Sequence, residues 1–428
     1  MILSYNIPVV LSSDRMRGMK HISDKLNNRI RILALTVLAI CLCCVFAACT
    51  KAQAESSDET DAVTTDVQNS AETVSEDAAE KYSRWLSDHY SAKVLTREKW
   101  LNDLMSTLKL TDGFPTDTNE IFAKAYENGL TASDAAEPYD ALTRRYAAET
   151  LFRALKYQPR DGQADDLTDA DTAMKTLVYY GWFLPNADGC VTPDAPVTDG
   201  EYARLIEETE RYERLHGKKV LSFGDSIMFG MGNHDSGISD MTAEKYGMIA
   251  LDYSVSGATF GVSAGRSHIP TQIKSAARIG VHPDIILLDG GTNDMVFVTR
   301  GNIAIGYDPK GVNERTFAGG FEYSAYLLDR YWKGVPVIYV RAHDMDASNN
   351  VMEQNYGELG LSIAEKWKLE CVDIFTDTGF CTEDAVIRDD YTAYKAKLGH
   401  SDGIHPTALG YAKFYLPLVA DKIDALLK

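Results

Sequence analysis

The chain of 428 residues has a formal net charge of −19, and 45 % of its residues are apolar and 10 % aromatic. This apolar content is sufficient for sizeable cores in about two or three domains. A chain this acidic repels nucleic acid and offers no basic stripe for it, so the composition argues against nucleic-acid binding.

The first 49 residues have the pattern of a secretory signal. Basic residues between positions 15 and 31 precede an apolar stretch, 32–48, whose small final residues stand before Cys49. Residues 46–49 (Phe-Ala-Ala-Cys) resemble a bacterial lipobox, although Phe46 stands where that box usually has leucine. The resemblance implies lipidation of Cys49 and a cell-surface lipoprotein on the outer side of the bacterial membrane. A cut after residues 52–54 (Ala-Gln-Ala), which gives a soluble secreted protein, and an uncleaved membrane anchor are the alternatives.

Residues 50–80 consist mainly of Ser, Thr, Ala, Asp and Glu, with no aromatic residue. Such a composition cannot bury enough apolar surface to fold, so we predict an acidic, disordered linker. Of the seven cysteines, only Cys190, Cys371 and Cys381 lie beyond the signal. They are too few for a disulfide framework, and both a Cys371–Cys381 bridge and free thiols stay open. No spacing of Cys and His is typical of a zinc site.

Between 81 and 215 large apolar residues recur at spacings of three and four, which predicts a helical domain. Three similar phrases occur here, each with a threonine able to cap a helix: 95–98 (Leu-Thr-Arg-Glu), 142–145 (Leu-Thr-Arg-Arg) and 197–203 (Val-Thr-Asp-Gly-Glu-Tyr-Ala). Their recurrence indicates an internal repeat. Residues 179–183 (Tyr-Tyr-Gly-Trp-Phe), followed by 192–198, resemble the junction between two S-layer homology repeats. The resemblance implies a degenerate pair of such repeats over about 90–215 that binds cell-wall polysaccharide, and an unrelated helical spacer is the alternative.

From residue 218 onward short apolar runs alternate with helical stretches, which predicts a parallel sheet with helices on both faces. The predicted strands are 219–223, 251–255, 284–289, 336–340 and 370–374. The predicted helices are 240–250, 269–279, 319–332, 353–367 and 408–427. Residues 295–318 form a long loop after the third strand, and loops at that position often wall a substrate site.

Four loops in this region carry residues suited to acyl transfer. They are Gly224-Asp225-Ser226, residues 254–259 with Gly257, residues 290–294 with Asn293, and residues 402–406 with Asp402 and His405. The first three follow strands, at the edge where open α/β sheets hold their ligands. The four blocks, in this order, resemble the SGNH hydrolases, also called the GDSL-like esterase/lipase family, over about 218–428. The resemblance implies a flavodoxin-like three-layer α/β/α domain with a five-stranded parallel sheet over 216–428.

Each block supplies a distinct part of the chemistry. A serine hydroxyl is a poor nucleophile until an imidazole takes its proton, so we expect Ser226 as nucleophile and His405 as general base and acid. Asp402, three residues earlier, can hold the other ring nitrogen of His405. The resemblance implies an oxyanion hole of the backbone N–H groups of Ser226 and Gly257 and the side-chain amide of Asn293. No metal or organic cofactor is required.

The spacing of the catalytic residues excludes the α/β-hydrolase fold, which other serine hydrolases adopt. There the nucleophile lies in Gly-x-Ser-x-Gly and its acid lies far from the histidine in sequence. Here Met228 stands two residues after Ser226, and the acid and base are three residues apart.

Several neighbouring residues are candidates for lesser roles. We expect Asp225 to brace the nucleophile turn or cap a helix, and Asp294 to be structural. His343, after the fourth strand, and His234, after the nucleophile loop, are candidate substrate contacts. For both histidines an ordinary loop position is the alternative.

The sequence therefore predicts an exported serine esterase that acts on an ester of cell-wall or dietary polysaccharide, with the O-acetyl group as the favoured acyl group. The prediction of ester hydrolysis depends on the four blocks. The prediction of a carbohydrate substrate depends on export and on the wall-binding resemblance. A lipase or lysophospholipase with the same triad is one alternative. A non-catalytic cell-wall-binding protein is another, and acyl transfer to a sugar hydroxyl stays open.

Overall fold

The computed structural model describes residues 95–111, 117–133, 137–168, 170–345 and 350–428. The predicted signal, Cys49, the linker 50–80 and residues 81–94 of the predicted helical domain lie outside the described residues. Within these ranges no helix has both the length and the apolar composition of a membrane span. All the described residues belong to one compact unit.

Five parallel strands form one sheet, in the order β2-β1-β3-β4-β5. They are β1 (Lys219–Phe223), β2 (Ile249–Asp252), β3 (Ile285–Asp289), β4 (Val337–Arg341) and β5 (Glu370–Asp373). Strand β3 is buried along its whole length, as a central strand covered on both faces must be. The order is that of flavodoxin-like sheets, with the switch point between β1 and β3. The predicted five-stranded parallel sheet is confirmed.

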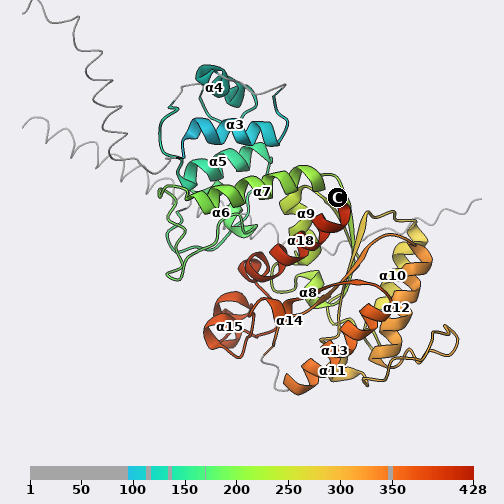
Figure 1. Cartoon of the computed structure of the whole chain (residues 1–428). Helices are drawn as coiled ribbons and strands as arrows, with labels where there is room; N and C mark the ends of the chain where they lie inside the picture. The colour runs from blue at the N-terminus through green and yellow to red at the C-terminus, as the bar shows by residue number, and fades with distance from the viewer. Residues whose placement is uncertain (1–94, 112–116, 134–136, 169, 346–349) are drawn as a thin grey trace, which may run out of the picture. The chain divides into compact units, whose positions relative to one another are not determined.

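Alternate residues of the strands enter two separate cores, because successive side chains point to opposite faces. Val220, Ile285 and Leu287 belong to the core that contains helices α9 (Ile238–Tyr246) and α18 (Leu416–Leu427). Leu221, Ile286 and Leu288 belong to the core that contains α10 (Ile269–Ile279), α12 (Phe317–Tyr331) and α13 (Asn350–Lys366). Figure 1 shows α10, α12 and α13 together on one side and α9 and α18 on the other.

Short helices connect these layers. They are α8 (Ser226–Phe229), α11 (Asp294–Phe297), α14 (Ile374–Asp377), α15 (Ala385–Tyr391), α16 (Lys395–Leu398), α17 (Ala408–Gly410) and the π-helical turn η1 (Tyr411–Tyr415). The predicted helix 408–427 is thus divided into α17, η1 and α18. Pro417, at the start of α18, lacks the N–H that would bond to the carbonyl four residues earlier, which disfavours a regular α-helix there.

One strand prediction was shifted along the chain. Strand β2 covers Ile249–Asp252 instead of 251–255, because Gly247 ends α9 in a left-handed conformation and the Ile249 N–H already bonds to Lys218 O at 2.8 Å. The last three predicted residues belong to the loop that carries Gly257. The three cysteines in the described part, Cys190, Cys371 and Cys381, are free thiols.

The helical region has α3 (Arg97–Thr107), α4 (Thr118–Glu127), α5 (Arg144–Ala154), α6 (Thr172–Tyr179) and α7 (Asp199–Leu215). Thr96, Thr143 and Thr198 cap α3, α5 and α7 through their side chains, so the three predicted caps are confirmed. The same backbone contact recurs between the phrases: Leu142 N–H donates to Leu95 O and Val197 N–H to Leu142 O, both at 2.8 Å. The structure therefore has the internal repeat, while the S-layer resemblance stays a prediction.

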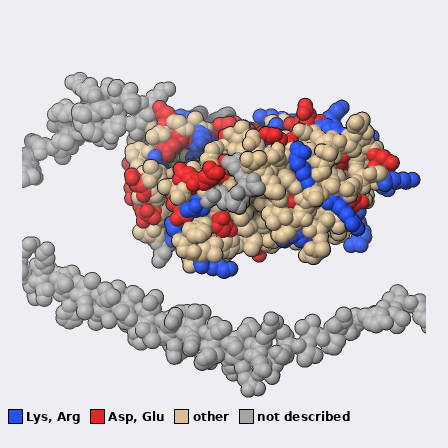
Figure 2. All heavy atoms as spheres, turned by 90° about the horizontal axis from the view of Figure 1, so that it is seen from below, with Lys and Arg blue, Asp and Glu red and all other residues tan. Residues whose placement is uncertain are grey.

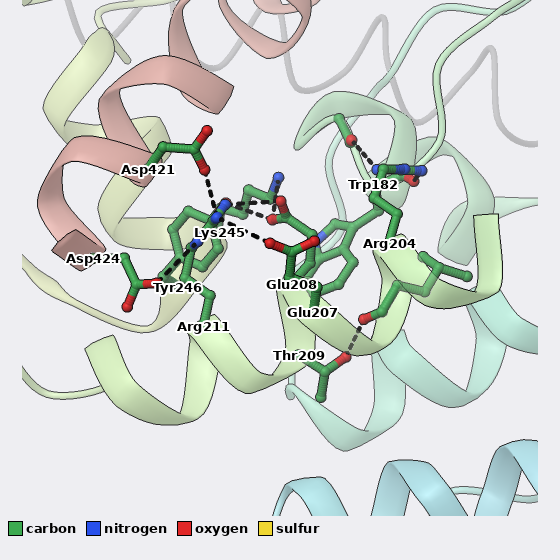
Figure 3. A network of polar contacts seen from close by, with 12 residues as sticks. Trp182, Arg204, Glu207, Glu208, Thr209, Arg211, Lys245, Tyr246, Asp421 and Asp424 are labelled. Atoms are coloured by element: carbon green, nitrogen blue, oxygen red, sulfur yellow. Dashed lines mark hydrogen bonds and ion pairs between the residues drawn. The ribbon is translucent and has the colours of Figure 1, made fainter. Parts of the chain in front are cut away.

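Helix α7 joins this region to the α/β layers through a buried network of charges (Figure 3). Glu208 on α7 pairs with Lys245 on α9 at 2.9 Å and with Arg211 at 2.9 Å. Arg214 pairs with Asp424 on α18 at 2.8 Å. The predicted domain boundary between residues 215 and 216 lies at the end of α7. The helical region and the α/β layers are in contact there through the network of α7, α9 and α18. On the face shown in Figure 2, acidic side chains gather toward one end, and basic side chains lie singly or in short groups.

Candidate active site

The nucleophile turn follows β1 directly. Ser226 is the first residue of α8, and Asp225 caps that helix by accepting the Ile227 N–H at 3.0 Å. A side-chain carbon at Gly224 would lie 2.7 Å from Met228 Cβ and 3.2 Å from Asp289 Cβ. Glycine is therefore required here by the close approach of β3 and α8, which brings the serine to the carboxyl edge of the sheet.

Ser226, His405 and Asp402 form a connected chain of hydrogen bonds. His405 Nε2 lies 2.9 Å from Ser226 Oγ, and His405 Nδ1 lies 2.6 Å from Asp402 Oδ2. With Nδ1–H donating to Asp402, Nε2 is left to accept the serine proton. Burial opposes ionisation of Asp402, but hydrogen bonds from the His405 ring and from the backbone N–H groups of Ile404 and His405 hold its pKa below the usual value. Asp402 is thus a carboxylate that can stabilise the imidazolium.

The loop that carries His405 is fastened to residues 391–394. Ala393 N–H donates to His405 O at 2.8 Å, and Asp402 N–H donates to Ala393 O at 2.9 Å. The ring of Tyr394 stands edge-on to His405, and its hydroxyl donates to Met231 O at 3.0 Å. Tyr394 therefore connects the general base with the segment after the nucleophile helix. It belongs to no motif, so the sequence carried no signal for it.

The three predicted oxyanion donors lie around the nucleophile turn. Within the described part of the chain, the N–H groups of Ser226 and Gly257 donate to no protein acceptor. Asn293 Nδ2 lies 3.3 Å from Asp225 Oδ2 and 3.1 Å from Ala258 O, which are the neighbours of Ser226 and Gly257. Two free N–H groups and a nearby amide are what a developing oxyanion needs.

Gly257 has a φ of +79°, and Arg266 donates to its carbonyl at 3.1 Å. The Arg266 guanidinium lies over the Phe297 ring, 3.3 Å from its centroid. Together with Val255 and Ser256, these residues line a shallow groove of about 480 Å³ beside Gly257. The beginning of the predicted long loop, at Phe297, therefore reaches the edge of the site.

Asp294 directly follows Asn293, the predicted oxyanion donor, and is fully buried. Its carboxyl group accepts the N–H groups of Phe260 and Gly261, each at 2.9 Å. Burial raises the pKa of Asp294 to about 7. The buried side chain thus joins the third block to the two residues that follow the second block, and its role is structural.

The two candidate substrate histidines lie in different environments. His343 is fully buried, stacks on Phe380 and lies 2.8 Å through Nδ1 from the Tyr415 hydroxyl. Burial lowers the pKa of His343 to about 3, so the ring is neutral and belongs to the core. His234 is exposed and lines a cavity of about 390 Å³ with Asn233 and residues of the helical region.

Replacing Asn293 with alanine is expected to lower kcat for p-nitrophenyl acetate by about 10²–10³-fold, because one oxyanion donor is lost. KM is expected to change little, since the donor acts mainly in the transition state. Asn119→Ala, an exposed position on α4, serves as the matched control. A kcat within threefold of the parent for Asn293→Ala would remove Asn293 from the oxyanion hole.

One family model and several solved structures match the chain. The family model described as GDSL-like lipase/acylhydrolase matches residues 222–413, which confirms the resemblance read from the four blocks. Among solved structures, a carbohydrate acetylesterase from Sinorhizobium meliloti is 16 % identical, with 49 % of this chain and 99 % of that chain covered and a TM-score of 0.34. The inhibitor-bound aryl esterase of M. smegmatis is 14 % identical, with 49 % and 100 % covered and a TM-score of 0.35.

A lipolytic protein of the G-D-S-L family from Veillonella parvula is 18 % identical, with 47 % of this chain and 97 % of that chain covered and a TM-score of 0.33. No curated protein matches the chain. Residues 222–413 thus match the GDSL-like lipase/acylhydrolase family model, which is consistent with a carboxylic ester hydrolase domain.

Proposed function

We propose that the protein is an exported serine esterase that removes O-acetyl groups from cell-wall or dietary polysaccharide. The observation that carries the catalytic part is the unbroken chain of hydrogen bonds from Ser226 through His405 to Asp402, at 2.9 and 2.6 Å. The N–H groups of Ser226 and Gly257, which donate to no acceptor among the described residues, support the electrostatic part.

The reaction proceeds in two acyl-transfer steps. His405 Nε2 takes the Ser226 proton as Oγ attacks the ester carbonyl, and Asp402 stabilises the imidazolium. The carbonyl oxygen gains negative charge and is held by the donors around Gly257. The ester C–O bond then breaks, and His405 gives the proton to the departing sugar hydroxyl. Water, activated by His405 in the same way, releases acetate from Ser226.

The 390 Å³ cavity that His234 lines is our candidate for the carbohydrate. Its walls include residues 232–234 and Ser236 after the nucleophile helix, residues 407–409 after the catalytic histidine, and residues 159–163 of the helical region. The charges at its edge are paired within the protein: Arg160 with Glu244, and Asp161 with Lys175. A cavity with polar walls and neutralised charge suits an uncharged, hydroxyl-rich ligand.

One observation favours the lipase alternative. Val255 and Phe297, which line the groove beside Gly257, are 42 % and 48 % exposed. Exposed apolar side chains at a catalytic groove suit a longer acyl chain. Acyl-chain length therefore separates the two candidates.

Export, the lipid anchor at Cys49 and wall binding by residues 81–215 complete the proposal. They are supported by the sequence patterns and by the repeated contacts of the helical region. Lipidation at Cys49 would hold the enzyme at the outer side of the membrane, near the wall polysaccharide.

The proposal predicts acetate release from acetylated xylan or acetylated peptidoglycan, measured against Ser226→Ala as the blank. Among p-nitrophenyl esters, acetate is expected to react at least about tenfold faster than octanoate, since a site shaped for an acetyl group would not accommodate the longer chain. Gln163→Trp, which fills the 390 Å³ cavity, is expected to lower kcat/KM for the polymer about tenfold and to leave p-nitrophenyl acetate unchanged.

Gln354→Trp, on the exposed surface of α13, is the matched control. Preference for octanoate without release from either polymer would overturn the carbohydrate proposal in favour of a lipase. Equal polymer activity of Gln163→Trp and the parent would remove the cavity from the proposal.

A further inference from the structure

Two carboxyl groups lie in contact behind the nucleophile turn. Asp225 and Asp289 are 0 % and 1 % exposed, accept the consecutive N–H groups of Ile227 and Met228 at 3.0 and 3.2 Å, and lie within hydrogen-bonding reach of each other. Asp225 follows β1, and Asp289 is the last residue of β3. The contact therefore joins the two strands on either side of the switch point, immediately below Ser226.

The partners of the two side chains differ. Asp225 accepts the Ile227 N–H through Oδ1 at 3.0 Å and the Asn293 amide through Oδ2 at 3.3 Å. Asp289 accepts the Met228 N–H through Oδ2 at 3.2 Å, and its Oδ1 receives no hydrogen bond from the described residues. Both oxygens of Asp225 accept hydrogen bonds, which favours its ionised form. Asp289 Oδ1 accepts none from the described residues, so it can carry a proton and donate it to Asp225.

Among the residues that the structure describes, no Lys or Arg forms an ion pair with either carboxyl group. The titratable groups that face the pair are His405 from the loop before α17, Tyr339 from β4, Tyr411 and Tyr415 from η1, and Asp294 from α11, whose pKa burial raises to about 7. Two buried carboxylates in contact repel each other strongly, so one must keep its proton. Burial and the charge of Asp225 raise the pKa of Asp289 well above its usual value, which agrees with the proton residing on Asp289.

We propose that Asp289 is a positioning residue of the esterase: its protonated carboxyl group donates to Asp225, and the fixed Asp225 carboxylate holds both the Asn293 amide and the start of the Ser226 helix. The inference rests on the proposed catalytic role of Ser226. Asp289 does not touch the ester. It acts through Asp225, whose two other hydrogen bonds lead to the oxyanion donor and to the nucleophile turn.

Ionisation of Asp289 at high pH would place a second charge against Asp225. The hydrogen bond between the two strands would be lost, and Asn293 and Ser226 would shift from their positions. A displacement of about 1 Å at a catalytic group can cost about 10²-fold in rate. We therefore expect kcat to fall at alkaline pH as Asp289 ionises, although Asp289 takes no part in the chemical steps.

The test uses Asp289→Asn and Asp289→Leu, with kcat and KM for p-nitrophenyl acetate measured across pH against Ser226→Ala as the blank. Asparagine keeps an N–H donor toward Asp225 and an oxygen toward Met228 but cannot ionise. Its kcat is expected within threefold of the parent at neutral pH, and the alkaline fall is expected to disappear. Leucine has no donor, so kcat is expected to fall about 10²-fold with KM within threefold.

Asp284→Asn, near the opposite end of β3, is the matched control and is expected to leave the pH profile unchanged. An unchanged alkaline fall in Asp289→Asn would overturn the inference, and so would a parental kcat in Asp289→Leu. If Asp289→Leu does not fold, the pH profile of Asp289→Asn decides alone. Activity that survives in Ser226→Ala would instead overturn the proposed function.

Discussion

Replacing Ser226 with alanine is expected to lower kcat for p-nitrophenyl acetate by about 10⁴–10⁶-fold, since the reaction loses its nucleophile and keeps only the oxyanion donors. The fold is expected to survive, because Ser226 Oγ contributes one hydrogen bond, to His405, and a single such bond contributes about 1 kcal/mol. Steady-state assays of nitrophenol or acetate release measure the loss of kcat. Circular dichroism checks that the fold survives.

Ser275→Ala provides the matched control, since this half-buried serine on α10 donates to the Thr271 carbonyl within its own helix. Its activity is expected to equal that of the parent. A well-folded Ser226→Ala protein that retains a tenth of the parental kcat would mean that another group performs the attack.

The largest expected effect on stability comes from Glu208→Ala. This substitution leaves Lys245, only 3 % exposed, without its carboxylate partner at 2.9 Å. Removing one member of a buried ion pair costs about 3–5 kcal/mol in the free energy of unfolding. Urea unfolding of both proteins, with the midpoint and slope fitted together, measures the difference.

Glu207→Ala is the matched control one position earlier on α7. Its side chain is 68 % exposed and pairs with Arg211 at 3.9 Å, so the expected change is within about 0.5 kcal/mol. A loss for Glu208→Ala no greater than that for Glu207→Ala would show that the network does not stabilise the junction of α7 with α9.

The defect of Glu208→Ala is also expected to depend on pH. Burial lowers the pKa of Lys245 in the folded state, so between the folded-state and unfolded-state pKa of this lysine the unfolded chain binds more protons. Stability then rises with pH until the lysine of the unfolded chain is deprotonated as well. The free energy of unfolding of Glu208→Ala is accordingly expected to recover as the pH is raised from 7 toward 10.

The order of elements and the four blocks could be read from the sequence because they are local signals. Strand β3 is a continuous apolar run, and the Gly224 turn, Gly257, Asn293 and the Asp402–His405 pair each lie at the end of an element. In a parallel sheet such ends share one edge, so knowledge of the strand order brings the blocks together.

The residues that the sequence did not reveal act over distances that no local pattern encodes. Tyr394 contacts His405 through a loop without a motif, and Asp289 reads as the end of an apolar strand until its contact with Asp225 is seen. His343 looked accessible because it follows a strand at the active edge. The packing of Phe380 and Tyr415 around it, from segments far along the chain, places it in the core instead.

The contact of η1 with the nucleophile turn affects when the active site forms during folding. The Tyr411 hydroxyl in η1 donates to Ile227 O at 2.7 Å, and His405 lies in the loop just before α17. Ser226 therefore meets its base only when the segment from His405 to η1 has docked on the sheet. Because such long-range contacts form late in folding, recovery of esterase activity during refolding should report completion of the native state and should lag behind the recovery of helical signal.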